Sequence, residues 1–174
     1  MTWLALDTAT DRATVAVGRD RETALEAHLD GARRHASAAL PMLQRLLDER
    51  GMTLADLRGI VIADGPGSFT GLRVGAAIAK ALAHSRGVPV FSAPSLMARA
   101  LAASAGKAEP VVVTSNALRG DVYAAVYRFR PAAVETLVAP RVVAAGELDT
   151  IVPRNAIVSG DRPADARDLI GLAG

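Results

Sequence analysis

The chain has 174 residues, of which 51% are hydrophobic and 3% aromatic, so one domain or two small lobes can pack a core of Ala, Val, Leu and Ile. The absence of cysteine excludes a disulfide framework, a thiolate zinc site and a cysteine nucleophile. The formal net charge is only +2, and the 20 Arg and Lys residues are spread along the chain, which gives little support for direct nucleic-acid binding.

The N-terminal segment carries neither a basic leader nor a long apolar run before Asp7, so it does not resemble a signal peptide. No stretch approaches the roughly 18 uncharged apolar residues of a membrane-spanning helix. We therefore expect a cytoplasmic protein that makes no contact with a membrane.

The first elements expected along the chain are three strands, at residues 3–9, 13–18 and 23–29. Each is apolar or alternating, and short polar turns separate them. Three consecutive strands with such short connections predict an antiparallel meander.

A helix is expected next, at residues 33–50, because its apolar residues fall on one broad arc at 100° per residue. Pro41 falls on the polar side, where a kink would curve the helix around a core. Gly51 is the expected stop, and Thr53 is placed to cap a short helix that follows.

A buried strand at 58–63 leads into a glycine-rich turn at 65–71 (GPGSFTG) and then into a helix that ends near residues 86–87. A strand at 88–91 and a helix opened by Pro94 complete the first lobe.

The second lobe is expected to begin with strands at 111–114 and 121–130, followed by shorter strands and a final helix. The pair VVVTSNALRGDVYAAV loosely repeats the opening pair LALDTATDRATVAV: apolar strand, polar turn, apolar strand. This repeat suggests a duplicated fold.

The glycine-rich turn admits three interpretations. A Walker P-loop requires Lys-Ser or Lys-Thr after its last glycine, and here Leu72 and Arg73 follow Gly71. A dinucleotide fingerprint should follow the first strand of a βαβ unit with an acidic residue about 20 positions later, and neither condition is met. The third interpretation is close packing of a helix on the sheet, which Gly71 and Gly75 favour because they share one helical face.

The helix after the turn is apolar around most of its circumference. Arg73, Lys80 and His84 form a narrow polar stripe, and nearly all other residues are Gly, Ala, Val, Ile or Leu. Such a helix must be covered on more than one side, so we expect the sheet to cover one side and a partner to cover another.

Three segments, GPGSFTGLRVGAAIAKALA, LALDTAT near the start and RRHASAALPML between them, resemble the TsaB (YeaZ) family. The resemblance covers residues 3–130 and implies an α/β fold of the actin, Hsp70 and sugar-kinase (ribonuclease H-like) type. That fold has two lobes with duplicated β-β-β-α-β-α cores. It places the first lobe, with the partner-binding helices, at 1–106. The second lies at 107–174 and is abbreviated, because relatives extend some tens of residues further.

The resemblance also implies a function without catalysis by this chain. The family is the accessory subunit of bacterial tRNA threonylcarbamoyladenosine synthesis, which pairs with the paralogous catalytic subunit TsaD and is assisted by the ATPase TsaE. The complex transfers a threonylcarbamoyl group to N6 of the tRNA adenosine beside the anticodon. No cofactor is expected in this chain, whereas ATP and a metal ion are expected in the partner subunits.

The metal site of the catalytic paralogue is expected to be missing. That paralogue carries a His-x-x-x-His pair after the corresponding strand, where imidazoles one helical turn apart converge on one ion. In this sequence Ser95 and Arg99 stand at those positions, a poor ligand and a permanent cation. The sequence therefore predicts that no metal binds there.

The first turn carries Asp7 and Asp11, where actin-like ATPases place a magnesium-linked carboxylate. One interpretation is a vestigial nucleotide or phosphate site, completed by three residues of the glycine-rich turn: Gly65, Gly67 and Ser68. The alternative, which we favour, is that the Asp carboxylates satisfy turn amides. Arg12 departs from the catalytic paralogue, which is acidic at that position.

The leading hypothesis is a scaffold subunit whose helices at 33–50 and 71–86 pair with equivalent helices of the partner. The candidate contact or supporting residues are Leu40, Leu43, Leu47, Val74, Ile78 and Ala81. Each of them fits a plain core position at least as well. A charge at Ile78 is expected to abolish pairing without unfolding the chain. Two alternatives stay open: an independent ATP-using actin-like enzyme, and a homodimeric binding module.

Overall fold

The computed structural model describes residues 2–19, 24–31, 35–117, 119–131 and 133–160. The chain divides into two compact units, Met1–Ala93 and Pro94–Gly174. This division falls earlier than the expected lobe boundary between residues 106 and 107. The physical reason is the helix α3 (Ser95–Ser104), which packs on the sheet of the second unit.

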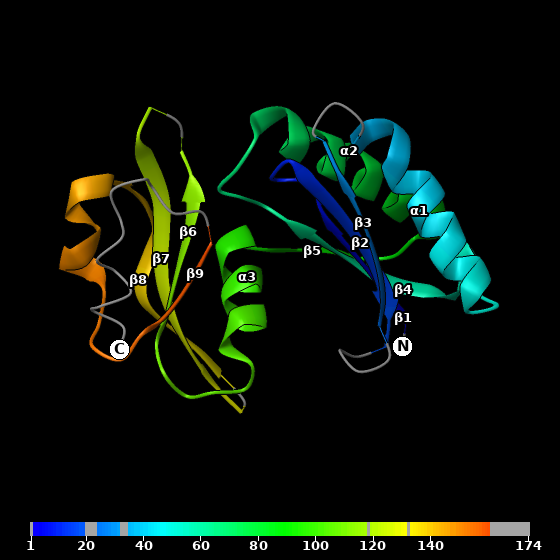
Figure 1. Cartoon of the computed structure of the whole chain (residues 1–174). Coiled ribbons are helices and arrows are strands. Elements are labelled where there is room, and N and C mark those ends of the chain that lie inside the picture. Colours follow the sequence, from blue (N-terminus) through cyan, green and yellow to red (C-terminus); the bar gives the residue numbers. More distant parts are fainter. Residues whose placement is uncertain (1, 20–23, 32–34, 118, 132, 161–174) are drawn as a thin grey trace. The chain divides into compact units, whose positions relative to one another are not determined.

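The first unit contains a five-stranded sheet in the order β3-β2-β1-β4-β5 (Figure 1). Its first three strands, β1 (Thr2–Asp7), β2 (Arg12–Gly18) and β3 (Leu25–Asp30), form the predicted antiparallel meander. The next two, β4 (Leu57–Ala63) and β5 (Val90–Ala93), run parallel to β1. The strand predicted at 88–91 thus begins and ends two residues later.

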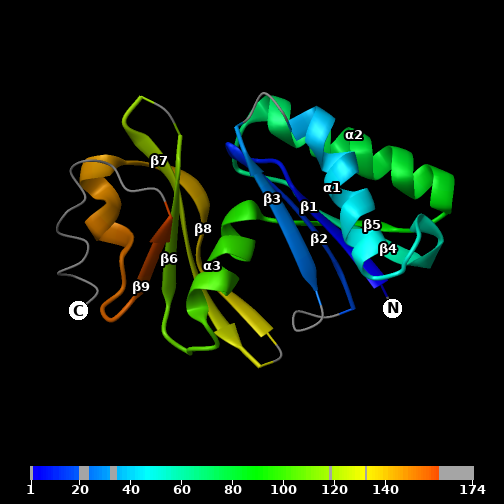
Figure 2. The same cartoon turned by 45° about the vertical axis from the view of Figure 1, so that its right-hand side comes forward.

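Two helices cover one face of this sheet and lie side by side in both views (Figures 1 and 2). Helix α1 (His35–Glu49) packs on β2 and β3, and helix α2 (Phe69–Arg86) packs on β4, β1 and β5. Their buried side chains share one core with the strands, which includes Leu4, Leu6, Val15, Val17, Leu43, Leu46, Leu47, Ile60, Ala79 and Leu82. The apolar arc predicted for α1 therefore faces the sheet, and Pro41 lies on its exposed side.

The helix ends in this unit follow the predicted local chemistry. Gly51, with φ of +60°, follows the end of α1 in the left-handed conformation that glycine tolerates best. Thr53 caps the short 3-10 helix η2 (Leu54–Asp56) through a capping box, in which Asp56 accepts a hydrogen bond from the Thr53 amide at 2.8 Å. Gly87, with φ of +64°, ends α2.

The opposite face of the first sheet carries the only tryptophan of the chain. The ring of Trp3 lies over Gly59, where a Cβ would overlap the indole. It also packs edge-on against Phe91 of β5, with ring centroids 5.6 Å apart. Phe91 stays 51% exposed and therefore extends an apolar surface along β5.

The second unit contains a four-stranded sheet in the order β8-β7-β6-β9. Its strands β6 (Val111–Asn116), β7 (Asp121–Arg130) and β8 (Ala133–Ala144) are antiparallel neighbours, and β9 (Ile157–Gly160) is parallel to β6. The order third, second, first, fourth is also the order of the first four strands in the first sheet, so the duplication inferred from the repeated strand pairs is confirmed.

Different elements cover the two faces of this second sheet. On one face Leu96 and Ala100 of α3 pack against strand residues that include Tyr127. On the other, Leu148 and Ile151 belong to the 3-10 helix η3 (Ala145–Ile151) and pack against β7 and β8. In the second unit η3 thus stands where the first unit has α1.

One expectation for the second unit is wrong. The strand after β7 is not short: β8 has 12 residues, because it pairs along the full length of β7. The expected final helix falls on residues 161–174, which lie outside the described residues. No helix in the described ranges is long and apolar enough to cross a membrane.

Candidate docking surface and glycine-rich turn

The glycine-rich turn between β4 and α2 is held by hydrogen bonds within the chain. Gly65 has φ of +104°, a conformation that favours glycine. Ser68 caps α2, and its Oγ accepts a hydrogen bond from the Gly71 amide at 3.2 Å. The Ser68 amide donates to the carbonyl of Ala9, between β1 and β2, at 2.7 Å. The buried hydroxyl of Thr8 donates to the Gly71 carbonyl at 2.7 Å, so the two turns are bonded directly.

The glycines allow these two turns to touch. A Cβ at Gly67 would overlap the carbonyl oxygen of Ala9, and a Cβ at Gly71 would overlap the carbonyl oxygen of Thr8. At Gly75 a Cβ would lie 2.6 Å from the Thr8 hydroxyl. The backbone of Thr8 and Ala9 therefore fills the space next to Gly67 and Gly71, and the Thr8 side chain fills the space next to Gly75, as the close-packing interpretation expects.

The carboxylate of Asp7 serves the turn after β1. Its Oδ1 accepts a hydrogen bond from the amide of Ala9 at 2.8 Å, the geometry of an Asx turn. Asp11 lies at the exposed end of the same turn, and its carbonyl accepts a hydrogen bond from the Gly31 amide at 2.8 Å. This hydrogen bond from the Ala9 amide to the Asp7 carboxylate is the kind of contact expected if the carboxylate satisfies amides of its own turn.

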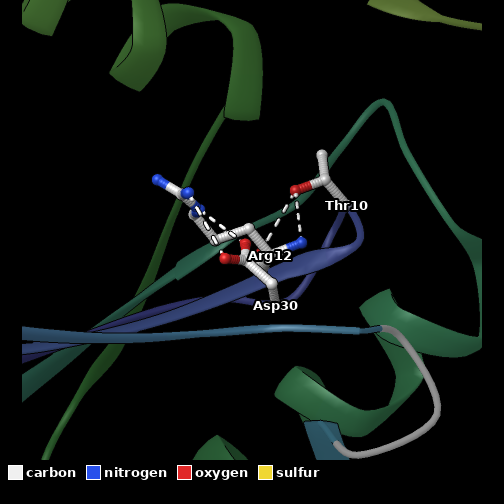
Figure 3. Close-up of polar contacts among 3 residues, drawn as sticks. All are labelled: Thr10, Arg12 and Asp30. Carbon is white, nitrogen blue, oxygen red and sulfur yellow. Dashed lines mark hydrogen bonds and ion pairs between the residues drawn. The ribbon is translucent and has the colours of Figure 1, made fainter.

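Arg12 begins β2 and forms an ion pair with Asp30 at the end of β3 (Figure 3). Its Nε lies 2.9 Å from Asp30 Oδ1, and its amide donates to the hydroxyl of Thr10 at 3.3 Å. The hydrogen bond from Arg12 lowers the pKa of the Asp30 carboxyl and raises the pKa of the guanidinium. Both side chains are exposed, so water screens the pair and its contribution to stability is small.

The predicted contact residues on α1 and α2 divide by burial. Leu43 is 3% exposed and Leu47 is fully buried, so both belong to the core and can only support a surface from beneath. Val74 and Ile78 are half-buried, and Ile78 packs against that core. A charge at Ile78 would therefore be placed against the core and would destabilise the chain, contrary to expectation.

The exposed members of the set are Leu40 and Ala81. Leu40 on α1 is 48% exposed, and Ala81 lies on the exposed side of α2. The predicted set omits Phe69, the first residue of α2, which is 73% exposed. The guanidinium of Arg73 lies 5.3 Å from its ring centroid. The sequence could have indicated that Phe69 is exposed. At 100° per residue, Phe69 projects from the side of the helix away from Gly71 and Gly75, the two glycines expected to pack on the sheet.

The positions that correspond to the histidines of the catalytic paralogue lie on α3. Ser95 is the buried first residue of that helix, and Arg99 is half-buried one turn later. Within the described residues, no three His, Asp or Glu side chains come together in an arrangement that could hold a metal ion. The prediction that no metal binds at Ser95 and Arg99 stays a prediction.

Comparisons with a family model and with curated proteins all match proteins of tRNA threonylcarbamoyladenosine synthesis. A family model described as TsaD, tRNA N6-adenosine threonylcarbamoyltransferase, matches residues 30–160. The tRNA threonylcarbamoyladenosine biosynthesis protein TsaB of Escherichia coli (strain K12) is 37% identical over 127 residues, 72% of this chain and 54% of that protein. Its namesake in Bacillus subtilis (strain 168) is 34% identical over 142 residues, 79% of this chain and 60% of that protein. The chain spans about half the length of the curated relatives that it matches.

A solved structure supports the fold. The crystal structure of an uncharacterized Pseudomonas aeruginosa protein with similarity to peptidase YEAZ superposes with a TM-score of 0.80 and 28% identity. The match covers 99% of this chain and 90% of that one. A second structure, YeaZ from Pseudomonas aeruginosa, gives a TM-score of 0.78. Together with the two sheets of equal strand order, these matches confirm the predicted α/β fold of the actin-like superfamily.

Proposed function

Because the chain belongs to the TsaB (YeaZ) family, we propose that it acts in tRNA threonylcarbamoyladenosine synthesis as a non-catalytic subunit. It docks with a TsaD-type catalytic subunit, which works with a TsaE-type ATPase. The complex transfers a threonylcarbamoyl group to N6 of the tRNA adenosine beside the anticodon. The partner subunits bind ATP and the metal ion. The tRNA binds to the assembled complex rather than to this chain alone.

The observation that carries the proposal is a set of apolar side chains exposed on α1 and α2, namely Leu40, Phe69 and Ala81. Leu40 and Ala81 are exposed on helices whose opposite sides already pack on the sheet. Phe69 adds a large exposed ring at the start of α2, held by Arg73. Exposed aromatic and arginine side chains beside small apolar residues are typical of the centre of a protein interface.

The glycine-rich turn supports a non-catalytic role. Thr8 and Ala9 occupy the space beside Gly67 and Gly71 with backbone atoms, and the Asp7 carboxylate is engaged by an amide of its own turn. A phosphate at this turn would therefore require the β1–β2 turn to move. This geometry disfavours the alternative of an independent ATP-using enzyme.

Copurification with the TsaD-type subunit tests the docking surface. We expect Leu40→Glu and Ala81→Glu each to weaken the complex by about tenfold or more, because each buries a carboxylate without a partner. The matched control is Ala102→Glu, the same substitution at an exposed alanine of α3, which should leave binding unchanged. Thermal melts of the isolated chain should agree among all three variants. Undiminished binding by Leu40→Glu and Ala81→Glu would contradict the proposed surface.

A tRNA modification assay with and without this chain tests the role itself. We expect modification only when the chain and the catalytic subunit are both present, and no ATP turnover by the purified chain with magnesium. Turnover by the chain alone would support the enzyme hypothesis instead. Sedimentation at several concentrations reports a homodimer, which must dissociate on addition of the catalytic subunit if both use the same surface.

A further inference from the structure

A shallow apolar groove of about 600 Å³ lies in the first unit between α2 and the strands β4 and β5. Ile62, Ala79, Ala83 and Val88 are among the residues that form its apolar part. The groove lies on one flank of α2. At 100° per residue, the proposed contact residue Ala81 projects from the opposite flank, so the two surfaces are separate.

The groove adjoins an unpaired strand edge. Among the described strands, β5 pairs only with β4. The carbonyls of Pro89 and Ala93 accept hydrogen bonds from the β4 side, from the amides of Ile60 at 3.0 Å and Asp64 at 3.1 Å. Because successive residues of a strand direct their peptide groups to opposite edges, Val90 and Ser92 direct theirs outward. An added strand would find donors and acceptors there.

The side chains along this edge are exposed on both faces of the sheet. Val90 is 41% exposed and lines the groove on the helix face. Phe91 is 51% exposed on the opposite face, next to Trp3. The side chains of a strand added along β5 would therefore cover Val90 on the helix face of the sheet and Phe91 on the opposite face.

The ionisable side chains at the groove are basic. Within the part of the chain that the structure describes, Lys80 and His84 are the ionisable residues that line it, and both are exposed. The whole of α2 contains no Asp or Glu. A ligand that carries carboxylates complements this rim. A second copy docked edge to edge would bring the same basic side chains together, which disfavours self-pairing.

We propose that the outer edge of β5 and the adjoining groove bind an extended acidic segment of a partner protein as an additional strand. In this arrangement the segment alternates apolar and acidic residues. Its apolar side chains pack beside Phe91. On the helix face, glutamate methylenes lie over Val90 and their carboxylates reach Lys80 and His84. Backbone hydrogen bonds to Val90 and Ser92 supply affinity. The contacts with Phe91 on one face of the sheet and with Lys80 and His84 on the other supply selectivity for an alternating apolar and acidic segment.

Fluorescence anisotropy with the full chain tests this proposal. The probe is a capped, labelled peptide of about eight residues in which valine and glutamate alternate, and the comparison peptide replaces glutamate with lysine. We expect the acidic peptide to bind about tenfold or more tightly than the basic one, with an affinity that falls as salt rises. The double variant Lys80→Glu with His84→Glu should lose this preference. The control Arg141→Glu, an exposed cation on β8, should change the affinity by less than about twofold.

A second measurement tests strand addition without altering the chain. Methylating alternate peptide nitrogens of the acidic probe on the edge that faces β5 should abolish binding, whereas methylating the other edge should not. In a separate comparison, Leu40→Glu on α1 should bind the probe normally, which separates this surface from the proposed docking surface. Equal binding of the acidic and basic peptides, insensitivity to methylation, or self-association of the chain through β5 would each overturn the proposal.

Discussion

Substitution of Gly71 by alanine tests whether the close contact between the two turns is a structural requirement. The new Cβ would overlap the carbonyl oxygen of Thr8, which is backbone and cannot rotate away. Relieving the overlap must displace the β1–β2 turn and strain the buried hydrogen bond from the Thr8 hydroxyl to the Gly71 carbonyl. Gly67 and Gly75 face the same turn, so the displacement cannot be absorbed locally.

The expected magnitude follows from three effects. Overpacking costs about 1–3 kcal/mol, and loss of one buried hydrogen bond costs about 1 kcal/mol. Alanine regains about 1 kcal/mol of helix propensity, because Gly71 lies within α2. We therefore expect Gly71→Ala to lower the free energy of unfolding by about 2 kcal/mol.

Urea unfolding followed by the fluorescence of Trp3 measures this change, because the only tryptophan lies in the first unit. The control is Gly146→Ala in the second unit, where a Cβ would meet nothing within 4 Å. Far-ultraviolet circular dichroism, which reports both units, follows its unfolding, and we expect a change of less than about 0.5 kcal/mol. If Gly71→Ala is as stable as the control, the turns are not held together in the way described.

Two further predictions concern the first unit. Leu47→Ala should lower the free energy of unfolding by about 2–5 kcal/mol because Leu47 is fully buried, whereas Leu40→Ala should change it by less than about 1 kcal/mol; urea unfolding separates the two. The backbone hydrogen bond from Thr53 lowers the pKa of Asp56 below its usual 3.8. The stabilisation is therefore complete above that value and is lost as pH falls through the lower folded pKa. The Thr53 hydroxyl donates a second hydrogen bond to Asp56, at 3.0 Å, and it also lowers this pKa. Thr53→Ala removes only the hydroxyl, so a carboxyl NMR titration should show the Asp56 midpoint shifted upward; an unchanged midpoint would contradict the contribution of the hydroxyl.

Local patterns sufficed for much of the first unit. The spacing of apolar residues predicts α1, and Gly51 and Thr53 predict where it stops and where η2 begins, because these effects act within a few residues. The glycine-rich turn and the end of α2 at Gly87 follow from the same kind of chemistry. The antiparallel meander of the first sheet follows from its short polar turns, and the duplication of the fold follows from the resemblance and the repeated strand pairs.

The rest depends on contacts between distant segments, which periodicity does not contain. An apolar helical arc does not say which of its residues meets the sheet, so Leu43 and Leu47 could not be separated from the exposed Leu40 by pattern alone. Helix α3 could not be assigned to the second sheet for the same reason. The length of β8 is set by its pairing with β7 rather than by its own alternation.

The bonded turns also bear on how the first unit opens. The Thr8 hydroxyl and the Gly71 carbonyl are 63 positions apart in the chain, and the Ser68 amide is bonded to Ala9 beside them. Neither bond can persist once β1 separates from α2, and each bond helps to hold the turn in which the other one lies. The Ser68 amide proton should therefore exchange with deuterium only through the largest opening of this unit, as slowly as amides at the centre of β1.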